Sequence, residues 1–317
     1  MPFRVYRPYD FPDPVDPALQ ADLRRLGVRF EKTLHPGTEA IVTLLDLRVD
    51  EALLSRLPRL RAVCNVAVGY DNIDVPAATR HGVWVTNTPD VLTDATADLA
   101  WALLLAAARR VAEGDRFVRA GRWKRWDWTM LRGVDVHGKT LGIVGAGRIG
   151  QAVARRAVGF SMRVLYASRE RKPAFERETG ARRAPLDRLL RESDFVSIHV
   201  ALTPETRGLI GARELGFMKP TAILVNTARG PIVDEAALAK ALRSGGIRAA
   251  GLDVFEREPA VHPDLLGLEN VVLCPHIGSA TDETRRAMYE TALRNLAAIV
   301  AGRRPPHPVN RPSRRPG

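Results

Sequence analysis

A glycine-rich segment with the spacing G-x-G-x-x-G, Gly145–Gly150, is the feature that most constrains the fold of this 317-residue chain. It directly follows Thr140–Val144, an apolar run typical of a buried strand, and it precedes Gln151–Val158, which has the pattern of a helix. The glycine spacing alone is weak, because ordinary turns are also rich in glycine. Placed between a strand and a helix, it predicts the first βαβ unit of a dinucleotide-binding sheet.

Each residue of this segment has a physical reason for its position. Gly145 permits the tight turn, Gly147 lets the backbone approach a pyrophosphate, and Gly150 allows close contact between helix and strand. The helix opens with Arg148 and Ile149, where backbone amides and the positive end of the helix dipole favour phosphate groups. We therefore expect a nicotinamide dinucleotide to bind at this turn.

The next strand, Arg163–Tyr166, bears on the choice of cofactor. An NAD site normally has Asp or Glu about 18–20 residues beyond the last glycine, where it binds the ribose 2′-hydroxyl. Ser168 and Arg169 stand there instead, and a hydroxyl with a guanidinium suits a 2′-phosphate. Glu170 would reach the ribose if the turn shifted slightly. NADP(H) is therefore favoured, and NAD(H) remains the alternative.

Strand and helix patterns alternate along the whole chain, which predicts parallel sheets with helices on both faces. A long helical run from about Ala95 to Ala120 separates two such series. A last helix, roughly Glu283 to Ala301, precedes a Pro/Arg-rich tail that we expect to be flexible. The predicted fold is α/β, with two Rossmann-like doubly wound parallel-sheet domains and an interdomain cleft. The expected strands include Arg4–Tyr6, Ile41–Leu45, Ala62–Asn65, Val83–Val85, Leu141–Val144, Ala222–Val225, Ala249–Leu252 and Val271–Leu273.

Composition argues against several other classes of protein. The net charge of +12 comes from basic residues scattered along the chain, so no nucleic-acid partner is expected. No apolar run reaches the roughly 20 residues of a membrane span, and the N-terminus lacks the apolar core of a signal peptide, so a cytoplasmic protein is expected. Cys64 and Cys274 are expected to be small core hydrophobes, and no metal site is predicted.

Three side chains that follow apolar runs form a candidate catalytic set: Arg229, Glu258 and His276. Arg229 can donate two parallel hydrogen bonds to a carboxylate and a carbonyl oxygen. His276 can deliver a proton near neutral pH, and Glu258 would orient its ring and favour the imidazolium. Each residue alone also suits a helix cap or a surface ion pair. Their occurrence after successive strands favours chemistry, because the carboxyl ends of parallel strands converge on the ligand crevice.

These segments resemble the D-isomer-specific 2-hydroxyacid dehydrogenase family over nearly the whole chain. The resemblance extends to Val68–Asp74, which is similar to the family's substrate loop, and to Val83–Asp98, which is similar to its hinge. It is greatest to glyoxylate/hydroxypyruvate reductases, whose NADPH-linked members similarly carry Ser-Arg at the end of the second strand. The implied activity is NAD(P)H-dependent reduction of a small 2-oxo acid, glyoxylate or hydroxypyruvate, to the D-2-hydroxy acid.

The resemblance also implies roles for the matching residues. Arg229 would bind the carboxylate and ketone oxygens of the substrate, His276 would donate the proton while paired with Glu258, and the backbone amides of Val68 and Gly69 would hold the carboxylate. The residues expected to contact or border the cofactor are Thr96, Thr227 and Asp253 around the nicotinamide, Val200 and Thr206 beside the adenosine, and His276 and Gly278.

The family's architecture implies a discontinuous substrate domain, residues 1–97 plus 284–317, and a dinucleotide-binding domain, residues 98–283, with a dimerisation arm. A homodimer is the expected assembly. The Arg122–Trp128 stretch departs from the family because it is shorter, so a role for Trp126 or Trp128 in the partner's active site is a hypothesis. Two alternatives stay open: a dehydrogenase for a larger D-2-hydroxy acid, and a nucleotide-sensing binding protein similar to the family's corepressors.

Overall fold

The computed structural model describes residues 2–11 and 16–312, and the chain divides into two compact units. One unit is Met1–Leu92 with Ser279–Gly317, and the other is Thr93–Gly278. The expected boundaries were 97/98 and 283/284. The observed boundaries, 92/93 and 278/279, each lie five residues earlier. The first difference arises because helix α4 (Thr93–Ala108) belongs to the second unit from its first residue.

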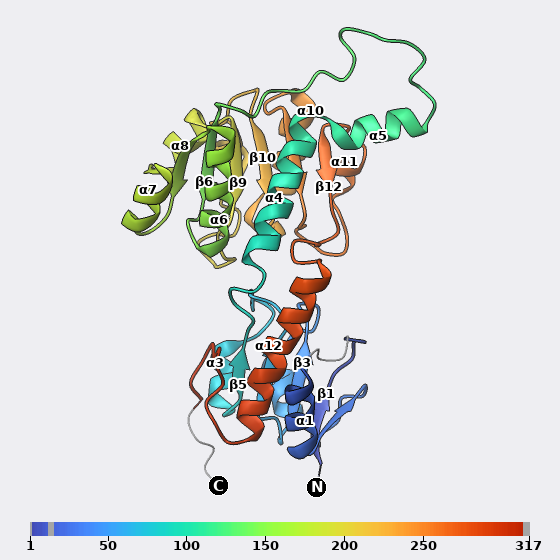
Figure 1. Ribbon diagram of the computed structural model, residues 1–317, viewed down its shortest axis with the longest axis vertical. Coiled ribbons are helices and arrows are strands. Elements are labelled where there is room, and N and C mark those ends of the chain that lie inside the picture. Colours follow the sequence, from blue (N-terminus) through green and yellow to red (C-terminus); the bar gives the residue numbers. More distant parts are fainter. Residues whose placement is uncertain (1, 12–15, 313–317) are drawn as a thin grey trace. The chain divides into compact units, whose positions relative to one another are not determined.

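The first unit is built on a parallel sheet of five strands in the order β2-β1-β3-β4-β5, within the residues described. The strand order reverses at β1, as in doubly wound folds. Helix α12 packs against β4, β5 and α1 (Figure 1). The elements are β1 (Phe3–Tyr6), α1 (Pro17–Arg25), β2 (Val28–Glu31), β3 (Ala40–Thr43), α2 (Glu51–Arg56), β4 (Ala62–Asn65), α3 (Val75–Arg80), β5 (Trp84–Thr86) and α12 (Asp282–Val300).

The second unit carries a parallel sheet of seven strands in the order β12-β11-β10-β9-β6-β7-β8. The order reverses at β6, so the ligand crevice of this fold is expected at the carboxyl ends of β6 and β9. After α4 the elements are α5 (Val111–Arg119), β6 (Thr140–Val144), α6 (Arg148–Ala157), β7 (Arg163–Ala167), α7 (Pro173–Thr179), β8 (Arg182–Arg183), α8 (Leu186–Glu192), β9 (Phe195–Ile198), α9 (Ala212–Leu215), β10 (Ile223–Asn226), α10 (Glu235–Ser244), β11 (Ala249–Leu252), α11 (Pro263–Leu266) and β12 (Val271–Leu273).

Both faces of the seven-stranded sheet are buried. Leu141 and Ile143 of β6 belong to an apolar cluster with α4 and α6, in which the indole Nε1 of Trp101 donates to the carbonyl of Val153 at 2.9 Å. The neighbouring Val144 belongs to the cluster on the other face, with residues of α8 and α10. Successive strand residues point to opposite faces, so an unbroken apolar run is the pattern of a strand covered on both sides. The predicted fold of two doubly wound parallel sheets is confirmed.

The long helical run expected from about Ala95 to Ala120 consists of two helices with a break between them. Helix α4 ends at Ala108 and α5 begins at Val111. Arg110 between them has a φ of 55°, in the left-handed region that a continuing helix does not allow. Its guanidinium donates two hydrogen bonds of 2.7 Å to Glu113, in the first turn of α5. Hydrophobic periodicity did not reveal this break.

The tail beyond α12 is bound to the first unit as far as the structure describes it, so the prediction of a flexible tail was wrong there. The amide of Val309 donates to the carbonyl of Val85 at 2.8 Å, and Asn310 contacts the backbone of Val83 and Val85. β5 is the edge strand of its sheet, and this segment satisfies backbone groups that the edge would leave unpaired. Residues 313–317 lie outside the described part.

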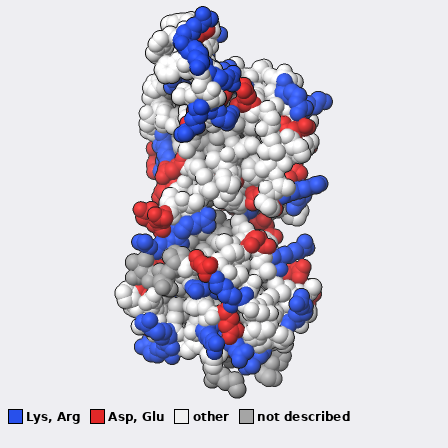
Figure 2. Space-filling model, turned by 90° about the vertical axis from the view of Figure 1, so that its right-hand side faces the viewer, with Lys and Arg blue, Asp and Glu red and all other residues white. Residues whose placement is uncertain are grey.

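Charged side chains are mixed on the surface. On the face drawn in Figure 2, lysine and arginine side chains alternate with acidic ones and do not form one continuous basic band. Several arginines bind carboxylates; Arg156, for example, contacts Asp94 at 3.2 Å and Asp98 at 2.7 Å. No helix in the described ranges is long and apolar enough to cross a membrane.

Candidate active site

Arg229, Glu258 and His276 follow three adjacent strands, β10, β11 and β12. These strands are parallel in register, so their carboxyl ends lie at the same edge of the sheet. The loops after β10 and β11 are in tight contact, because a Cβ atom built on Gly230 would lie 1.8 Å from the backbone carbon of Phe255. A glycine is therefore required there to bring the two loops together.

His276 and Glu258 form a direct pair. Nδ1 of His276 lies 2.7 Å from Oε2 of Glu258, and the two side chains are 33% and 35% exposed. The other oxygen of the carboxylate, Oε1, accepts a hydrogen bond from the backbone amide of Phe255 at 3.0 Å. Because Nδ1 is bound to the carboxylate, Nε2 is the ring nitrogen available for proton transfer to a ligand.

The charge state of Glu258 is set by opposing effects. Burial alone would raise the pKa of its carboxyl group, but the hydrogen bond and charge of His276 act against burial. The amide of Phe255 and the nearby guanidinium of Arg229 act in the same direction, and the net result is a pKa below the ordinary value. The carboxylate therefore stays ionised at neutral pH and can hold the ring through Nδ1.

Asp253 fixes the loop that carries His276. Its side chain is 1% exposed, and its two oxygens accept hydrogen bonds from the backbone amides of Ile277 and Gly278, both at 2.7 Å. The amide of His276 donates to the Asp253 carbonyl at 2.9 Å. His276 has a φ of 53°, a left-handed conformation that costs free energy unless the surroundings hold it. Burial raises the pKa of Asp253 despite the two amide donors.

The backbone around Arg229 is held by an asparagine that the sequence analysis did not single out. Nδ2 of Asn226 donates to the Arg229 carbonyl at 2.9 Å, and Oδ1 of the same side chain accepts from the amide of Ala228 at 3.0 Å. Asn226 is buried as the last residue of β10. It closes the turn that directs the half-buried Arg229 side chain, whose Nη1 also donates to the carbonyl of Ala228.

The glycine loop fits a dinucleotide pyrophosphate. Gly145 has a φ of 100°, and a Cβ atom on Gly150 would lie 2.1 Å from the carbonyl oxygen of Gly145, so both positions need glycine for the fold itself. Gly147 is different, because a Cβ atom there would meet nothing within 4 Å. No side chain caps the N-terminus of α6, which begins with Arg148 and Ile149. Open space in front of uncapped amides is what a phosphate group requires.

The turn after β7 contains the residues expected to select the cofactor. The Ser168 hydroxyl donates to the carbonyl of Glu170 at 2.5 Å, and the Arg169 charge acts on Glu205, whose pKa is lowered mainly by a hydrogen bond with Thr203. The carboxylate of Glu170 is 81% exposed and lies 3.2 Å from Nζ of Lys172. In this conformation Glu170 is engaged by a neighbouring lysine.

The remaining cofactor candidates fall into three groups. Thr96 lies beside Gly278 and Asp253, since a Cβ on Gly278 would meet Thr96 at 3.4 Å and Asp253 at 3.1 Å. The Thr227 hydroxyl is buried and has no hydrogen-bond partner among the described residues, as expected of a group that binds a ligand. Val200 lies beside the glycine loop, within 2.7 Å of a Cβ built on Gly145, and Thr206 is bonded within its own loop, to Ala201 at 2.6 Å.

Val68 and Gly69 lie in the first unit, and two further asparagines fix their backbone. Nδ2 of Asn87 donates to the Val68 carbonyl at 2.9 Å, and Nδ2 of Asn65 donates to the Gly69 carbonyl at 2.6 Å. Asn65 is fully buried at the end of β4. A polar residue closing an otherwise apolar strand was the available sequence signal for both Asn65 and Asn226.

His199, just beyond β9, is a half-buried residue that the sequence pattern did not single out. Its Nε2 lies 2.8 Å from the hydroxyl of Ser197. Burial lowers the pKa of His199 from 6.5 to about 3, so the ring is neutral at physiological pH. A Cβ atom on Gly145 would lie 2.7 Å from the His199 backbone, which puts this residue directly behind the glycine loop.

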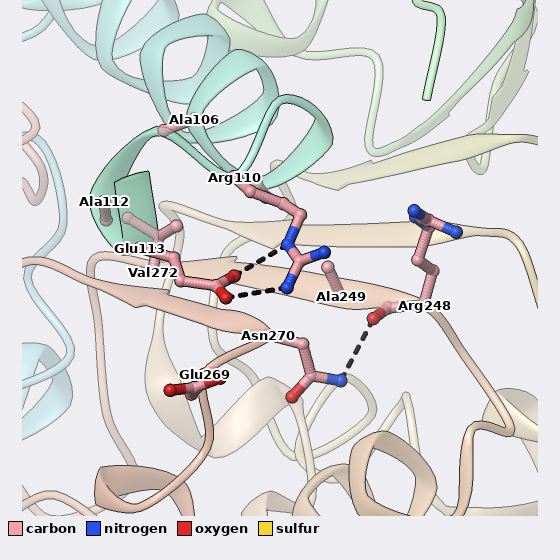
Figure 3. A pocket seen from close by; sticks show the side chains of 10 residues that line it. Ala106, Arg110, Ala112, Glu113, Arg248, Ala249, Glu269, Asn270 and Val272 are labelled. Carbon is pink, nitrogen blue, oxygen red and sulfur yellow. Dashed lines mark hydrogen bonds and ion pairs between the residues drawn. The ribbon is translucent and has the colours of Figure 1, made fainter. Parts of the chain in front are cut away.

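A separate pocket of about 380 Å³ lies at the opposite edge of the seven-stranded sheet (Figure 3). Arg248 and Asn270, which line it, immediately precede β11 and β12, so the pocket is at the amino ends of these strands. Figure 3 shows the Arg110–Glu113 ion pair among the residues that line it. The pocket therefore does not belong to the site formed by the strand carboxyl ends.

Comparison with known proteins agrees with this geometry. Residues 101–278 match the family described as D-isomer specific 2-hydroxyacid dehydrogenase, NAD binding domain. The chain is 59% identical over 277 residues to a glyoxylate reductase of Thermococcus onnurineus, covering 86% of this chain and 83% of that protein.

Solved structures are similar over nearly the whole chain. A glyoxylate reductase from Paecilomyes thermophila has a TM-score of 0.87 at 35% identity, covering 97% of this chain and 98% of that one. An NADPH-dependent glyoxylate/hydroxypyruvate reductase from Sinorhizobium meliloti, in complex with NADP and malonate, has a TM-score of 0.87 at 34% identity, with 99% of each chain covered.

Proposed function

The chain belongs to the D-isomer-specific 2-hydroxyacid dehydrogenase family, and from this premise we propose that it reduces glyoxylate and hydroxypyruvate to the D-2-hydroxy acids with NADPH. The observation that carries the proposal is the 2.7 Å contact between Nδ1 of His276 and Oε2 of Glu258. It lies at the edge of the sheet where Arg229 also follows a strand. A proton donor, its carboxylate partner and a guanidinium are the groups that reduction of a 2-oxo acid requires.

Each of the three residues has one task in the proposed reaction. Bound NADPH supplies the hydride. Arg229 binds the carboxylate and polarises the ketone, which a planar guanidinium does through two parallel hydrogen bonds. His276 gives the proton on Nε2 to the ketone oxygen, and Glu258 holds the ring by Nδ1 and stabilises its charge. The roles expected for Val68 and Gly69 remain predictions of the family resemblance.

The proposed preference for NADPH is supported by the turn after β7. Glu170 is the one residue of this turn that the sequence analysis considered for the ribose 2′-hydroxyl, and its carboxylate is engaged by Lys172. Arg169 would bind a 2′-phosphate through its charged guanidinium, and Ser168 would turn its hydroxyl from the Glu170 carbonyl to the phosphate. One similar reductase, from Sinorhizobium meliloti, is described as NADPH-dependent and was solved with NADP.

Initial rates with glyoxylate and hydroxypyruvate, each with NADPH and with NADH, test this proposal. We expect turnover with both acids and a higher kcat/KM with NADPH. Turnover only with larger 2-oxo acids would assign a different substrate to the same chemistry. Binding of NADPH without turnover of any 2-oxo acid would contradict the proposed enzymatic activity and favour a nucleotide-sensing binding protein.

A second copy of the chain is the proposed partner. Helix α5 buries none of its residues and, with the loop after it, extends away from the seven-stranded sheet (Figure 1). Trp126 and Trp128 in this loop are 85% and 94% exposed. Large apolar side chains exposed in a group are typical of an interface. Sedimentation should give twice the mass of one chain, and replacing both tryptophans with alanine should shift the equilibrium towards monomer.

A further inference from the structure

Arg183, on the two-residue edge strand β8, holds the turn that follows β7. Its Nε and Nη2 atoms donate to the carbonyl of Ser168 at 3.2 and 3.0 Å, and Nη2 also donates to the carbonyl of Arg169 at 2.8 Å. One guanidinium therefore binds two successive peptide carbonyls in the segment expected to select the cofactor.

The orientation of the two carbonyls determines where the following amides point. In a trans peptide the N–H of the next residue points opposite to the C=O. With the carbonyls of Ser168 and Arg169 turned to Arg183, the amides of Arg169 and Glu170 point away from it. β8 borders one edge of β7 and β6 borders the other. The glycine loop follows β6, and its Gly145 amide binds the Ala167 carbonyl at 2.9 Å, directly before the turn.

The hydrogen bonds of Arg183 do not neutralise its charge, because their acceptors are neutral carbonyl oxygens. The charge acts without a hydrogen bond on Glu176, whose pKa is lowered mainly by hydrogen bonds with Arg171 and Tyr166. Other basic residues of this turn pair directly with carboxylates: Arg171 with Glu176 at 2.8 Å and Lys172 with Glu170 at 3.2 Å. Successive amides that point to one place, backed by a cation, form a concavity suited to phosphate.

We propose that Arg183 is a positioning residue for cofactor specificity, which turns the amides of Arg169 and Glu170 towards a phosphate on the 2′-position of the adenosine ribose. This inference rests on the proposed function and extends it from Ser168 and Arg169 to the opposite side of the turn. The guanidinium acts through its two-pronged geometry, which a lysine ammonium does not reproduce.

Calorimetric binding of 2′,5′-ADP and of 5′-AMP tests the inference without catalysis. The variants are Arg183→Lys and Arg183→Gln, and the control is Arg182→Gln. The control removes the same charge from the adjacent residue, whose side chain points to the other face of the sheet. We expect both Arg183 variants to bind 2′,5′-ADP about tenfold more weakly, as expected for lost hydrogen bonds around a charged group, with 5′-AMP nearly unchanged. The control should bind both nucleotides as the wild type does.

Kinetics give a second readout that a purely structural role would not produce. In both Arg183 variants the KM for NADPH should rise while kcat and the KM for NADH stay near wild type. Wild-type affinity for 2′,5′-ADP in Arg183→Lys, or an equal loss of both nucleotides, would overturn the role of Arg183 and leave the reductase proposal standing. If the wild-type enzyme binds 2′,5′-ADP no better than 5′-AMP, both this inference and the NADPH preference are overturned. If it binds 2′,5′-ADP but turns over no 2-oxo acid, only the proposed reductase activity is overturned.

Discussion

Nδ1 of His276 lies 2.7 Å from Oε2 of Glu258, although the two residues belong to loops after different strands. The contact depends on two backbone anchors: the amide of Phe255 binds the second oxygen of Glu258, and Asp253 binds the amides of Ile277 and Gly278. Both partners are therefore held before any substrate binds. This preorganisation is the physical basis of the first two predictions.

Replacing His276 with asparagine should remove the proton donor and preserve a polar side chain of smaller size. We expect kcat for glyoxylate reduction to fall by about 10²–10⁴, the usual contribution of a well-placed general acid. Steady-state rates measure the loss, and quenching of tryptophan fluorescence by NADPH checks that the cofactor still binds. A variant with nearly full kcat would show that the proton comes from another group.

Glu258→Gln should keep the shape of the pair and remove its charge. The pKa of Glu258 is lowered, so the wild-type carboxylate is ionised at neutral pH and accepts the hydrogen bond of the His276 ring. Without this charge the ring is held less firmly, and reduction should be slower. Steady-state rates at about pH 7, with deuterated NADPH to show that chemistry limits turnover, measure the loss. A variant with the wild-type rate would contradict the role of Glu258.

Arg229→Lys tests the guanidinium as the substrate-binding group. Lysine keeps the charge but cannot donate two parallel hydrogen bonds from a planar group. We expect kcat/KM for glyoxylate to fall by roughly 10–100-fold, corresponding to the loss of a charge-assisted hydrogen bond. The KM for NADPH is the internal control and should change little. If instead only the KM for NADPH changed, Arg229 would belong to the cofactor site.

Ser168→Asp should reverse the cofactor preference. A carboxylate at the end of β7 repels a 2′-phosphate and accepts hydrogen bonds from a ribose hydroxyl. The ratio of kcat/KM for NADPH to that for NADH should fall by about 10–100-fold, in line with the free energy of hydrogen bonds to charged groups. Ser168→Ala is the matched control and should lower the NADPH value without raising the NADH value.

His199 should make the fold sensitive to acid. Its pKa is about 3 in the folded protein and 6.5 as the ordinary value, so between these pH values the unfolded chain binds a proton that the native ring does not. Stability then falls as pH decreases through this window, by at most about 1.4 kcal/mol per pH unit. His199→Gln keeps a polar partner for Ser197 and does not titrate. Urea unfolding at several pH values should show a shallower pH dependence in the variant, and parallel curves would refute the assignment.

Much of the fold and the positions of the main site residues could be predicted from local patterns. The glycine loop was recognisable because its residues are adjacent and each meets a steric requirement set within a few residues, as for Gly145 and Gly150. Arg229, Glu258 and His276 could be grouped because they follow apolar strands, and parallel strands end at a common edge.

Tertiary structure alone decided the contacts between segments distant in sequence. It determined that Glu258 binds Nδ1 of His276, that Asp253 holds the left-handed turn of His276, and that Arg183 reaches back to Ser168. Hydrophobic periodicity records which residues are buried, but a hydrogen bond depends on the distance and direction between two particular atoms. The strand pattern thus fixed the edge at which the site lies, and the packing of the loops fixed which atoms meet there.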